Sequence, residues 1–183
     1  MTSLFHIRHA AACVRGGGVI ACPAEAVWGL SCDPWNRGAV QQLCDMKQRP
    51  LSKGVIVASA DVADFAPLLD GLTLEQQQTV LNSWPGPVTW LVPHRDFFPS
   101  WVTGESTEVA IRVTSAPALS KLCRELGGPV VTTSANWAGA QPAKHSFQVV
   151  RYFGVGVTRV PGQVNLQGRP SSIKRAITGE VIR

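Results

Sequence analysis

The stretch Pro117–Asn136, PALSKLCRELGGPVVTTSAN, contains the change from helix to strand on which the predicted fold rests. Pro117–Leu126 is predicted to be helical, because proline is tolerated in the first turn of a helix. The glycines at 127 and 128 favour the end of that helix. The short β-branched run that follows, Pro129–Thr133, predicts a strand.

This predicted strand runs directly into a polar loop, Ser134–Gly139. Ser134 and Asn136 offer neutral hydrogen-bond donors, and with backbone N–H groups they suit the binding of phosphate oxygens. The same residue types also form Asx and Ser turns, in which a side chain bonds its own backbone. The loop taken alone is compatible with either role.

Outward from this stretch, predicted helices and strands alternate along the whole chain. We expect helices over residues 4–15, 36–47, 60–69, 73–84 and 146–153, and strands over 19–22, 54–59, 88–92, 108–114 and 155–160, with a hairpin over 170–183. This regular alternation excludes an all-β fold, and hairpin-like connections favour a mixed sheet over a purely parallel one. The sequence therefore predicts a single α/β domain over residues 1–183.

After the strand that ends at Pro23, the segment Ala24–Asp33 (AEAVWGLSCD) is expected at an exposed edge. Its small residues and Gly29 allow a backbone to approach a ligand closely, and Trp28 would then form one wall of the site. Trp28 is equally compatible with a place in the core.

Lys47 and Arg49 lie two residues apart at the end of a predicted helix, just before Pro50. Proline favours an extended backbone at the preceding residue, and in that geometry two such side chains point the same way and can bind one anion. A solvated helix end is the alternative, since cations suit the last turn. Arg112, inside the predicted strand 108–114, is either a positioned ligand contact or a surface charge.

The composition favours an anionic partner, since 17 Lys and Arg residues against 12 Asp and Glu give a net charge of +5. The five cysteines show no zinc-ligand spacing and are interpreted as reduced core thiols. No run is long and apolar enough to span a membrane, and the N-terminus lacks a signal-peptide pattern, so we expect a soluble, cytoplasmic protein.

The common nucleotide-binding, metalloprotease and hydrolase motifs are absent, as are paired carboxylates. The candidate site is thus rich in cations and hydroxyls and poor in carboxylates, a composition that stabilises anions. No metal ligands are assigned.

Five motifs, taken in order along the chain, resemble the YrdC/TsaC family of threonylcarbamoyl-AMP synthases in its short, single-domain bacterial form. They include both halves of the family's Lys-x-Arg and Ser-x-Asn signature. The motifs are Pro23–Leu30, Lys47–Pro50, Trp84–Thr89, Ala110–Val113 and Thr133–Asn136.

The resemblance implies a twisted mixed α/β sheet around a deep basic cavity. It also implies a nucleotidyltransferase that forms threonylcarbamoyl-adenylate and pyrophosphate from L-threonine, bicarbonate and ATP, with Mg²⁺ accompanying the ATP. The product would supply the group that modifies adenosine beside the anticodon of certain tRNAs, through tRNA threonylcarbamoyl-transfer proteins. Catalytic roles fall to Lys47 and Arg49. Substrate or nucleotide binding falls to the same two residues and to Arg112, Ser134, Asn136, Ala24, Trp28 and Ser172.

The chain departs from the family pattern at two of these positions. Ala24 stands where the family usually has threonine, and Trp28 where it has tyrosine or phenylalanine. The lost hydroxyl removes a hydrogen bond of about 1 kcal/mol. The pair Ser171–Ser172 replaces a Ser-Thr of many relatives, so hydroxyls persist there.

A second functional class is a non-catalytic module that binds double-stranded RNA or tRNA during RNA maturation. The positive net charge and the basic cavity of the family support it. The lack of a basic stripe and of stacking aromatic residues in an RNA-recognition pattern speaks against it.

Overall fold

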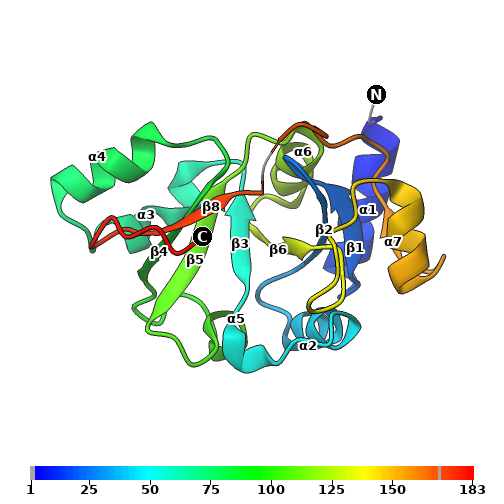
Figure 1. The fold of residues 1–183 in the computed structure, drawn as a ribbon, viewed down its shortest axis with the longest axis horizontal. Helices are drawn as coiled ribbons and strands as arrows, with labels where there is room; N and C mark the ends of the chain where they lie inside the picture. The colour runs from blue at the N-terminus through cyan, green and yellow to red at the C-terminus, as the bar shows by residue number, and fades with distance from the viewer. Residues whose placement is uncertain (1–2, 169) are drawn as a thin grey trace.

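The computed structural model describes residues 3–168 and 170–183, which fold around one eight-stranded mixed sheet (Figure 1). The strand order is β7-β1-β2-β6-β3-β5-β4-β8, with parallel pairing in β1–β7, β3–β5 and β4–β8. The predicted mixed α/β sheet is confirmed. The strands are β1 (Ile20–Pro23), β2 (Trp28–Cys32), β3 (Ile56–Ser59), β4 (Val88–Pro93), β5 (Glu108–Val113), β6 (Val130–Ser134), β7 (Thr158–Arg159) and β8 (Ser172–Arg175).

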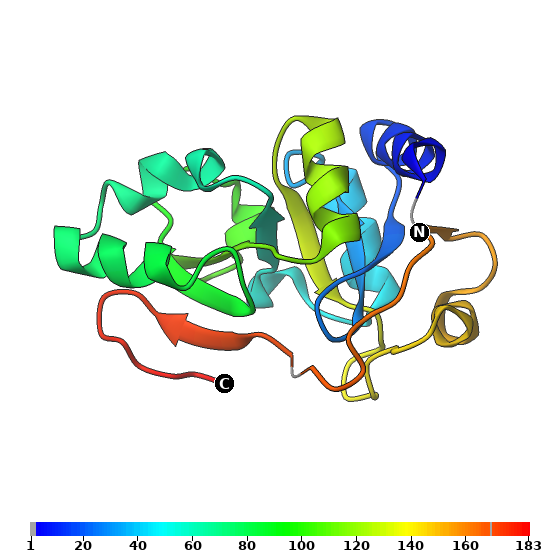
Figure 2. The same cartoon turned by 90° about the horizontal axis from the view of Figure 1, so that it is seen from above.

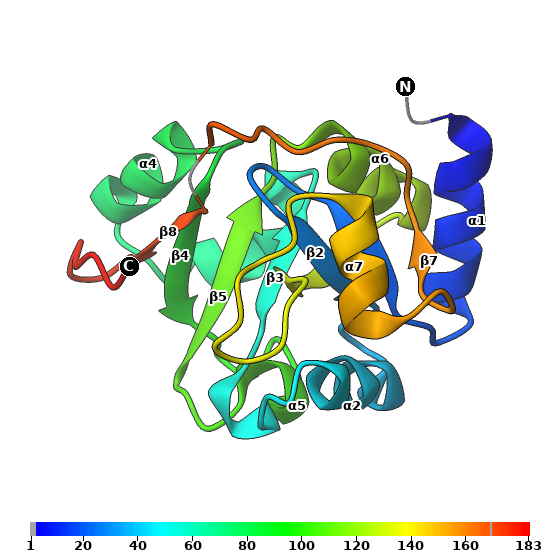
Figure 3. The ribbon, with the colours of Figure 1, turned by 45° about the vertical axis from the view of Figure 1, so that its right-hand side comes forward.

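Helices pack on both sides of this sheet. They are α1 (Leu4–Arg15), α2 (Arg37–Met46), α3 (Ala66–Leu69), α4 (Leu74–Asn82), α5 (Ser100–Thr103), α6 (Pro117–Leu126) and α7 (Ser146–Phe153), with 3-10 turns η1 (Leu51–Lys53) and η2 (Val62–Phe65). Helices α1 and α6 lie side by side on one face, whereas α7 and the C-terminal segment lie toward the other (Figure 2). Figure 3 shows α7 in front of β2, with α6 behind the sheet.

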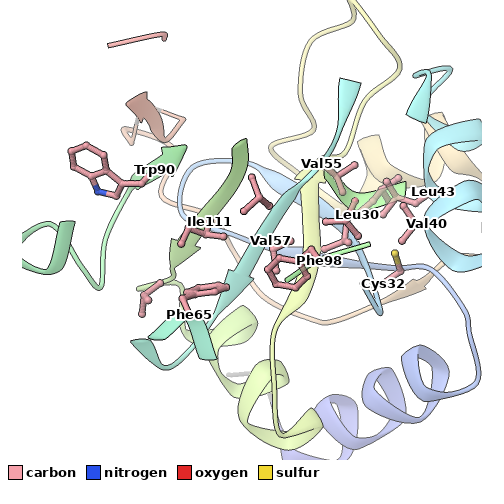
Figure 4. Packing of buried hydrophobic residues seen from close by; sticks show 14 of the residues in the cluster. Leu30, Cys32, Val40, Leu43, Val55, Val57, Phe65, Trp90, Phe98 and Ile111 are labelled. Carbon is pink, nitrogen blue, oxygen red and sulfur yellow. The ribbon is translucent and has the colours of Figure 1, made fainter. Parts of the chain in front are cut away.

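Strand alternation divides the core into two clusters, one on each face of the sheet. Val130 packs with Ile7 of α1 and Leu122 of α6, whereas its neighbour Val131 belongs to the larger cluster around Val57 (Figure 4). Successive side chains of a strand point to opposite faces, so both faces of β6 are buried. The start of this strand is therefore held between two packed layers, and its half-buried end, Thr133–Ser134, leads out of them.

Local signals place several element ends where the sequence predicts them. Asn36 caps α2 by accepting a hydrogen bond from the Ala39 N–H at 3.0 Å. Thr73 and Gln76 form the predicted capping box of α4. Gly127 ends α6 in the left-handed conformation with φ of 77°, which glycine adopts without steric cost.

Other predictions are wrong. Residues 28–32 of the expected edge segment form β2, which is fully buried between β1 and β6. At Gly29 the neighbouring strand approaches closely: a Cβ there would lie 3.1 Å from the Thr132 hydroxyl. The expected strand 155–160 is reduced to β7, and the expected helix 60–69 divides into η2 and α3.

Gly104 lies in tight contact with the backbone of Ser52, and a substitution at Gly104 tests this contact. Its φ is +67°, and a Cβ there would lie 2.3 Å from the Ser52 carbonyl oxygen. We expect Gly104→Ala to lower the free energy of unfolding by about 2 kcal/mol or more, because backbone strain adds to a clash with backbone. Urea denaturation measures this loss.

Gly127→Ala is the matched control, because Gly127 has a similar φ of +77° but no atom within 4 Å of the added Cβ. We expect it to cost about 1 kcal/mol, the strain of the left-handed conformation alone. Equal losses in the two variants would contradict the close contact at Gly104.

Candidate active site

A cavity of about 660 Å³ lies over six neighbouring strands, β2, β6, β3, β5, β4 and β8. Most of the residues predicted to bind substrate line it: Ala24, Trp28, Lys47, Arg49, Arg112, Ser134 and Asn136. Ser172 is not among the lining residues, although its neighbours Ser171 and Ile173 are. The fold thus brings seven of the eight predicted positions to one place.

Sheet register explains this convergence. Gly29 of β2 pairs with Ser134 at the end of β6, and the Ala135 N–H donates to the Trp28 carbonyl oxygen at 2.7 Å. On the other side of β6, Thr132 pairs with Ile56 at the start of β3. The polar loop after β6 is therefore fixed against two strands.

Lys47 joins the end of α2 to this loop. Its side chain is only 4% exposed, and its ammonium group donates to the carbonyl oxygens of Ser134 and Asn136, the latter at 2.9 Å. The Ala138 N–H returns a hydrogen bond to the Lys47 carbonyl oxygen at 2.9 Å. The alternative of a solvated helix end is wrong for this residue.

The electrostatics of Lys47 follow from its position. Burial disfavours the charged form, and the positive charge of Arg49 adds to the effect, so the pKa of Lys47 falls to about 8. The ammonium group is held only by neutral carbonyl dipoles in its hydrogen bonds. An anion bound in the cavity would supply a negative charge to balance the Lys47 ammonium group.

Arg49 approaches the cavity by a different geometry from the predicted one. Gln48 has a φ of +53°, so the backbone between the two cations turns in the left-handed region and is not extended. The Arg49 guanidinium donates to the carbonyl oxygens of Lys53 at 3.0 Å and Gly54 at 3.0 and 3.2 Å. The two cations converge because each is anchored to backbone carbonyls.

The side-chain amide of Asn136 forms hydrogen bonds within the loop through its NH₂ group. Its NH₂ group donates to the carbonyl oxygens of Trp137 at 2.7 Å and Ala140 at 2.8 Å. Its Oδ1 atom is buried without a hydrogen-bond partner among the residues that the structure describes. A flipped amide would direct oxygen at two carbonyls, so this orientation follows from the contacts. The amide therefore fixes the conformation of the loop at the cavity wall.

Arg112 is neither a surface charge nor a solvated side chain, because it is 6% exposed. Its Nη2 atom lies 3.3 Å from Oε2 of Glu25, and the Thr114 hydroxyl donates to Oε1 of that carboxylate at 2.7 Å. Burial lowers the pKa of Arg112, and the charge of Glu25 opposes that effect.

Two carboxylates that the sequence reasoning missed line the cavity, Glu25 and Glu108. Glu108 pairs with Arg175 of β8 at 3.0 Å. The prediction that the site contains few carboxylates is therefore wrong. One sequence signal could have indicated Glu25 as a site residue. It lies in the hairpin loop between two strands, and this loop lines the cavity.

Trp28 belongs to the core, since it is 1% exposed and packs in the larger cluster while also lining the cavity. Ala24 is half-buried beside it. The core-thiol prediction is confirmed for four cysteines, which are buried and free: Cys22, Cys32, Cys44 and Cys123. Cys13 is free but only partly buried.

Over residues 3–168 and 170–183, no cluster of three or more His, Cys, Asp or Glu side chains could hold a metal ion. Within the same ranges, no helix has the length and apolar character needed to cross a membrane.

Comparisons with known proteins agree with this geometry. The family model Sua5/yciO/yrdC, described as "Telomere recombination", matches residues 12–183. A protein of Cellvibrio japonicus named threonylcarbamoyl-AMP synthase is 47% identical over 178 residues, which cover 97% of this chain and 94% of that protein. A protein of the same name from Marinobacter nauticus is 48% identical over 172 residues, covering 93% and 90%.

Among solved structures, Sua5 of P. abyssi complexed with L-threonine superposes with a TM-score of 0.83 at 26% identity. The match covers 92% of this chain and 50% of the Sua5 chain, so this protein spans about half of that relative. The family match and the two close relatives establish that the chain belongs to the Sua5/YciO/YrdC family.

Proposed function

We propose that this protein is a threonylcarbamoyl-AMP synthase, a nucleotidyltransferase that converts L-threonine, bicarbonate and ATP to threonylcarbamoyl-adenylate and pyrophosphate. The observation that carries the proposal is the meeting of Lys47 and Arg49 with Ser134 and Asn136 in one cavity. The names of relatives that share almost half of its residues over nearly the full chain support it.

Charge neutralisation is the first task of such a site. The reactants carry a carboxylate, a carbamate and phosphates, which repel one another when they are brought together. Lys47 has three N–H groups, of which two are directed at carbonyl oxygens. The third, with the Arg49 guanidinium, is available to the α-phosphate and the carbamate. Catalysis is then by positioning and charge stabilisation.

Ser134 and Asn136 lie on the nucleotide side of the proposed site. The Asn136 amide fixes the loop there, because its NH₂ group donates to two carbonyl oxygens of that loop. The Ser134 hydroxyl, at the end of β6, can donate to phosphate.

The opposite wall, with Arg112 and Glu25, suits the amino acid, because it presents a cation beside a carboxylate to a zwitterion. The L-threonine complex of P. abyssi Sua5 supports threonine as this substrate. Ala24 and Trp28 would line the same subsite.

Magnesium would enter with ATP as part of the substrate. The lining carboxylates Glu25 and Glu108 both face arginines, so these side chains do not fit a magnesium cage built by the protein. The triphosphate itself would hold the ion.

The product would pass to tRNA threonylcarbamoyl-transfer proteins in the cytoplasm, where ATP and tRNA are available. The names of the relatives favour the synthase over a non-catalytic module that binds double-stranded RNA or tRNA.

Lys47→Ala and Arg49→Ala are each expected to lower threonine-dependent pyrophosphate release by at least about a hundredfold, because each removes a charge that stabilises the reacting phosphate. The control is Lys121→Ala, an equal charge change at an exposed position on α6 that does not line the cavity. Near-normal turnover in both cavity variants, with thermal unfolding unchanged, would contradict the proposed roles. Wild-type protein that releases no pyrophosphate with threonine, bicarbonate, Mg²⁺ and ATP would sink the proposed function.

The affinity for ATP should fall above about pH 8, where Lys47 loses its proton. ATP phosphates are already ionised there, so we expect the Kd for ATP to rise about tenfold between pH 7.5 and 9.5. Calorimetric titration without threonine or bicarbonate measures it. In Lys47→Arg, which keeps its charge, the Kd for ATP should not change over this pH range. An equally steep rise in that variant would refute the assignment of the pH dependence to Lys47.

The same titration changes stability in the opposite sense. The folded-state pKa of about 8 lies below the ordinary lysine value of 10.5, so between these values the unfolded chain binds more protons. The contribution of Lys47 to stability therefore increases as pH rises through that window.

Ala24→Thr restores the hydroxyl that the family usually has. We expect it to lower the KM for L-threonine about fivefold, the equivalent of one neutral hydrogen bond. Ala24→Val, which adds similar volume without a hydroxyl, is the control. An equal effect of both variants would mean that packing is responsible.

A further inference from the structure

Arg112 is a buried cation whose hydrogen-bonding capacity is only partly used. Its Nη2 atom faces Glu25 at 3.3 Å, whereas its buried Nε atom has no partner among the described residues. A guanidinium has five N–H donors, and buried donors are costly unless they are hydrogen-bonded. The Nε atom is closed off from solvent, but Arg112 lines the cavity, so the other N–H groups of its guanidinium are the ones that can meet a ligand there.

Glu25 is the anchor that fixes this arginine, and it is itself fixed at both ends. The Thr114 hydroxyl donates to Oε1 at 2.7 Å, so the carboxylate has a defined orientation. The Glu25 carbonyl oxygen accepts from the Asn165 N–H at 2.9 Å, and the Ala24 N–H donates to the Val27 carbonyl oxygen at 3.1 Å. The loop between β1 and β2 therefore holds Glu25 rigidly.

Charge distinguishes this wall from the opposite one. Lys47, Arg49 and Lys53 line the cavity at the end of α2, which suits a triphosphate. At Arg112 the carboxylate of Glu25 cancels much of the positive charge and would repel phosphate. The pair fits a group of single negative charge.

We propose that Glu25 is a positioning residue that orients Arg112 toward the carboxylate of the amino-acid substrate, and so sets the affinity for that substrate independently of ATP. This inference rests on the proposed function. The acidic side chain acts through Arg112 and Thr114 and takes no part in the transfer itself.

Glu25→Gln tests the proposal, because it removes the charge and keeps the size of the side chain. We expect the KM for L-threonine to rise about tenfold, while the KM for ATP stays within about twofold of the wild-type value. Pyrophosphate release at varied threonine and at varied ATP gives both constants. Glu25→Asp should restore part of the threonine affinity.

Glu125→Gln is the matched control, because it removes the charge from an arginine–carboxylate pair, with Arg8 at 3.8 Å, in which neither residue lines the cavity. We expect the ratio of its two KM values to stay at the wild-type value. An unchanged KM for threonine in Glu25→Gln, or an equal rise in both KM values, would overturn the positioning role.

Thr114 gives a second test that does not alter the ion pair directly. Thr114→Val removes the hydroxyl that holds Glu25 and should raise the KM for threonine about threefold, whereas Thr114→Ser should not. If Glu25→Gln fails to fold, the two Thr114 variants test the proposal in its place. Equal KM values for threonine in Thr114→Val and Thr114→Ser would overturn it.

Calorimetry with L-threonine alone separates this inference from the proposed function. Wild-type protein that neither binds threonine nor releases pyrophosphate would overturn both. Wild-type binding that Glu25→Gln and Thr114→Val leave unchanged would overturn only the role of Glu25.

Discussion

The buried ammonium group of Lys47 is the contact on which the arrangement of the cavity depends. It joins the end of α2 to the loop after β6 by donating to the carbonyl oxygens of Ser134 and Asn136. A desolvated cation is costly unless it is hydrogen-bonded, so this side chain and this loop must take up their positions together. The same contact leaves the charge at the cavity wall. The fold and the candidate chemistry therefore share one interaction.

Rigid elements surround this contact. Gln48 turns the chain in the left-handed region, and the carbonyl oxygens of Lys53 and Gly54 then receive the Arg49 guanidinium. Gly54 and Gly104 allow the backbone beneath them to approach more closely than a side chain would permit. Donors held in this way need little rearrangement when an anion binds, which is the condition for electrostatic stabilisation of a transition state.

The parts of the structure that the sequence predicted are those that depend on neighbouring residues. Asn36, the Thr73–Gln76 box and Gly127 act within a few positions of the helix ends that they define. The resemblance to a family located Lys47 and the loop at 134–136, but not what they contact. Their hydrogen bonds join residues that are 87 and 89 positions apart, and no local pattern encodes such a contact.

The same reason explains the wrong predictions. The small residues of β2 suggested an exposed edge open to a ligand, because the sequence does not show that β6 packs tightly beside Gly29. The surface-charge alternative for Arg112 is wrong because its partner, Glu25, lies in a distant hairpin loop that the sequence does not place beside it. In both cases tertiary packing decides the outcome, as it commonly does for strands.

The two cationic walls of the cavity differ in what balances their charge, and this difference has a functional consequence. At α2, neutral carbonyl oxygens hold Lys47 and Arg49, so the full positive charge remains for a ligand. Across the cavity, Glu25 offsets Arg112 and leaves a weaker, directional site. A uniformly basic cavity would attract phosphate to both walls. An internal carboxylate on one wall would supply the repulsion that keeps phosphate away from the side proposed for the amino acid.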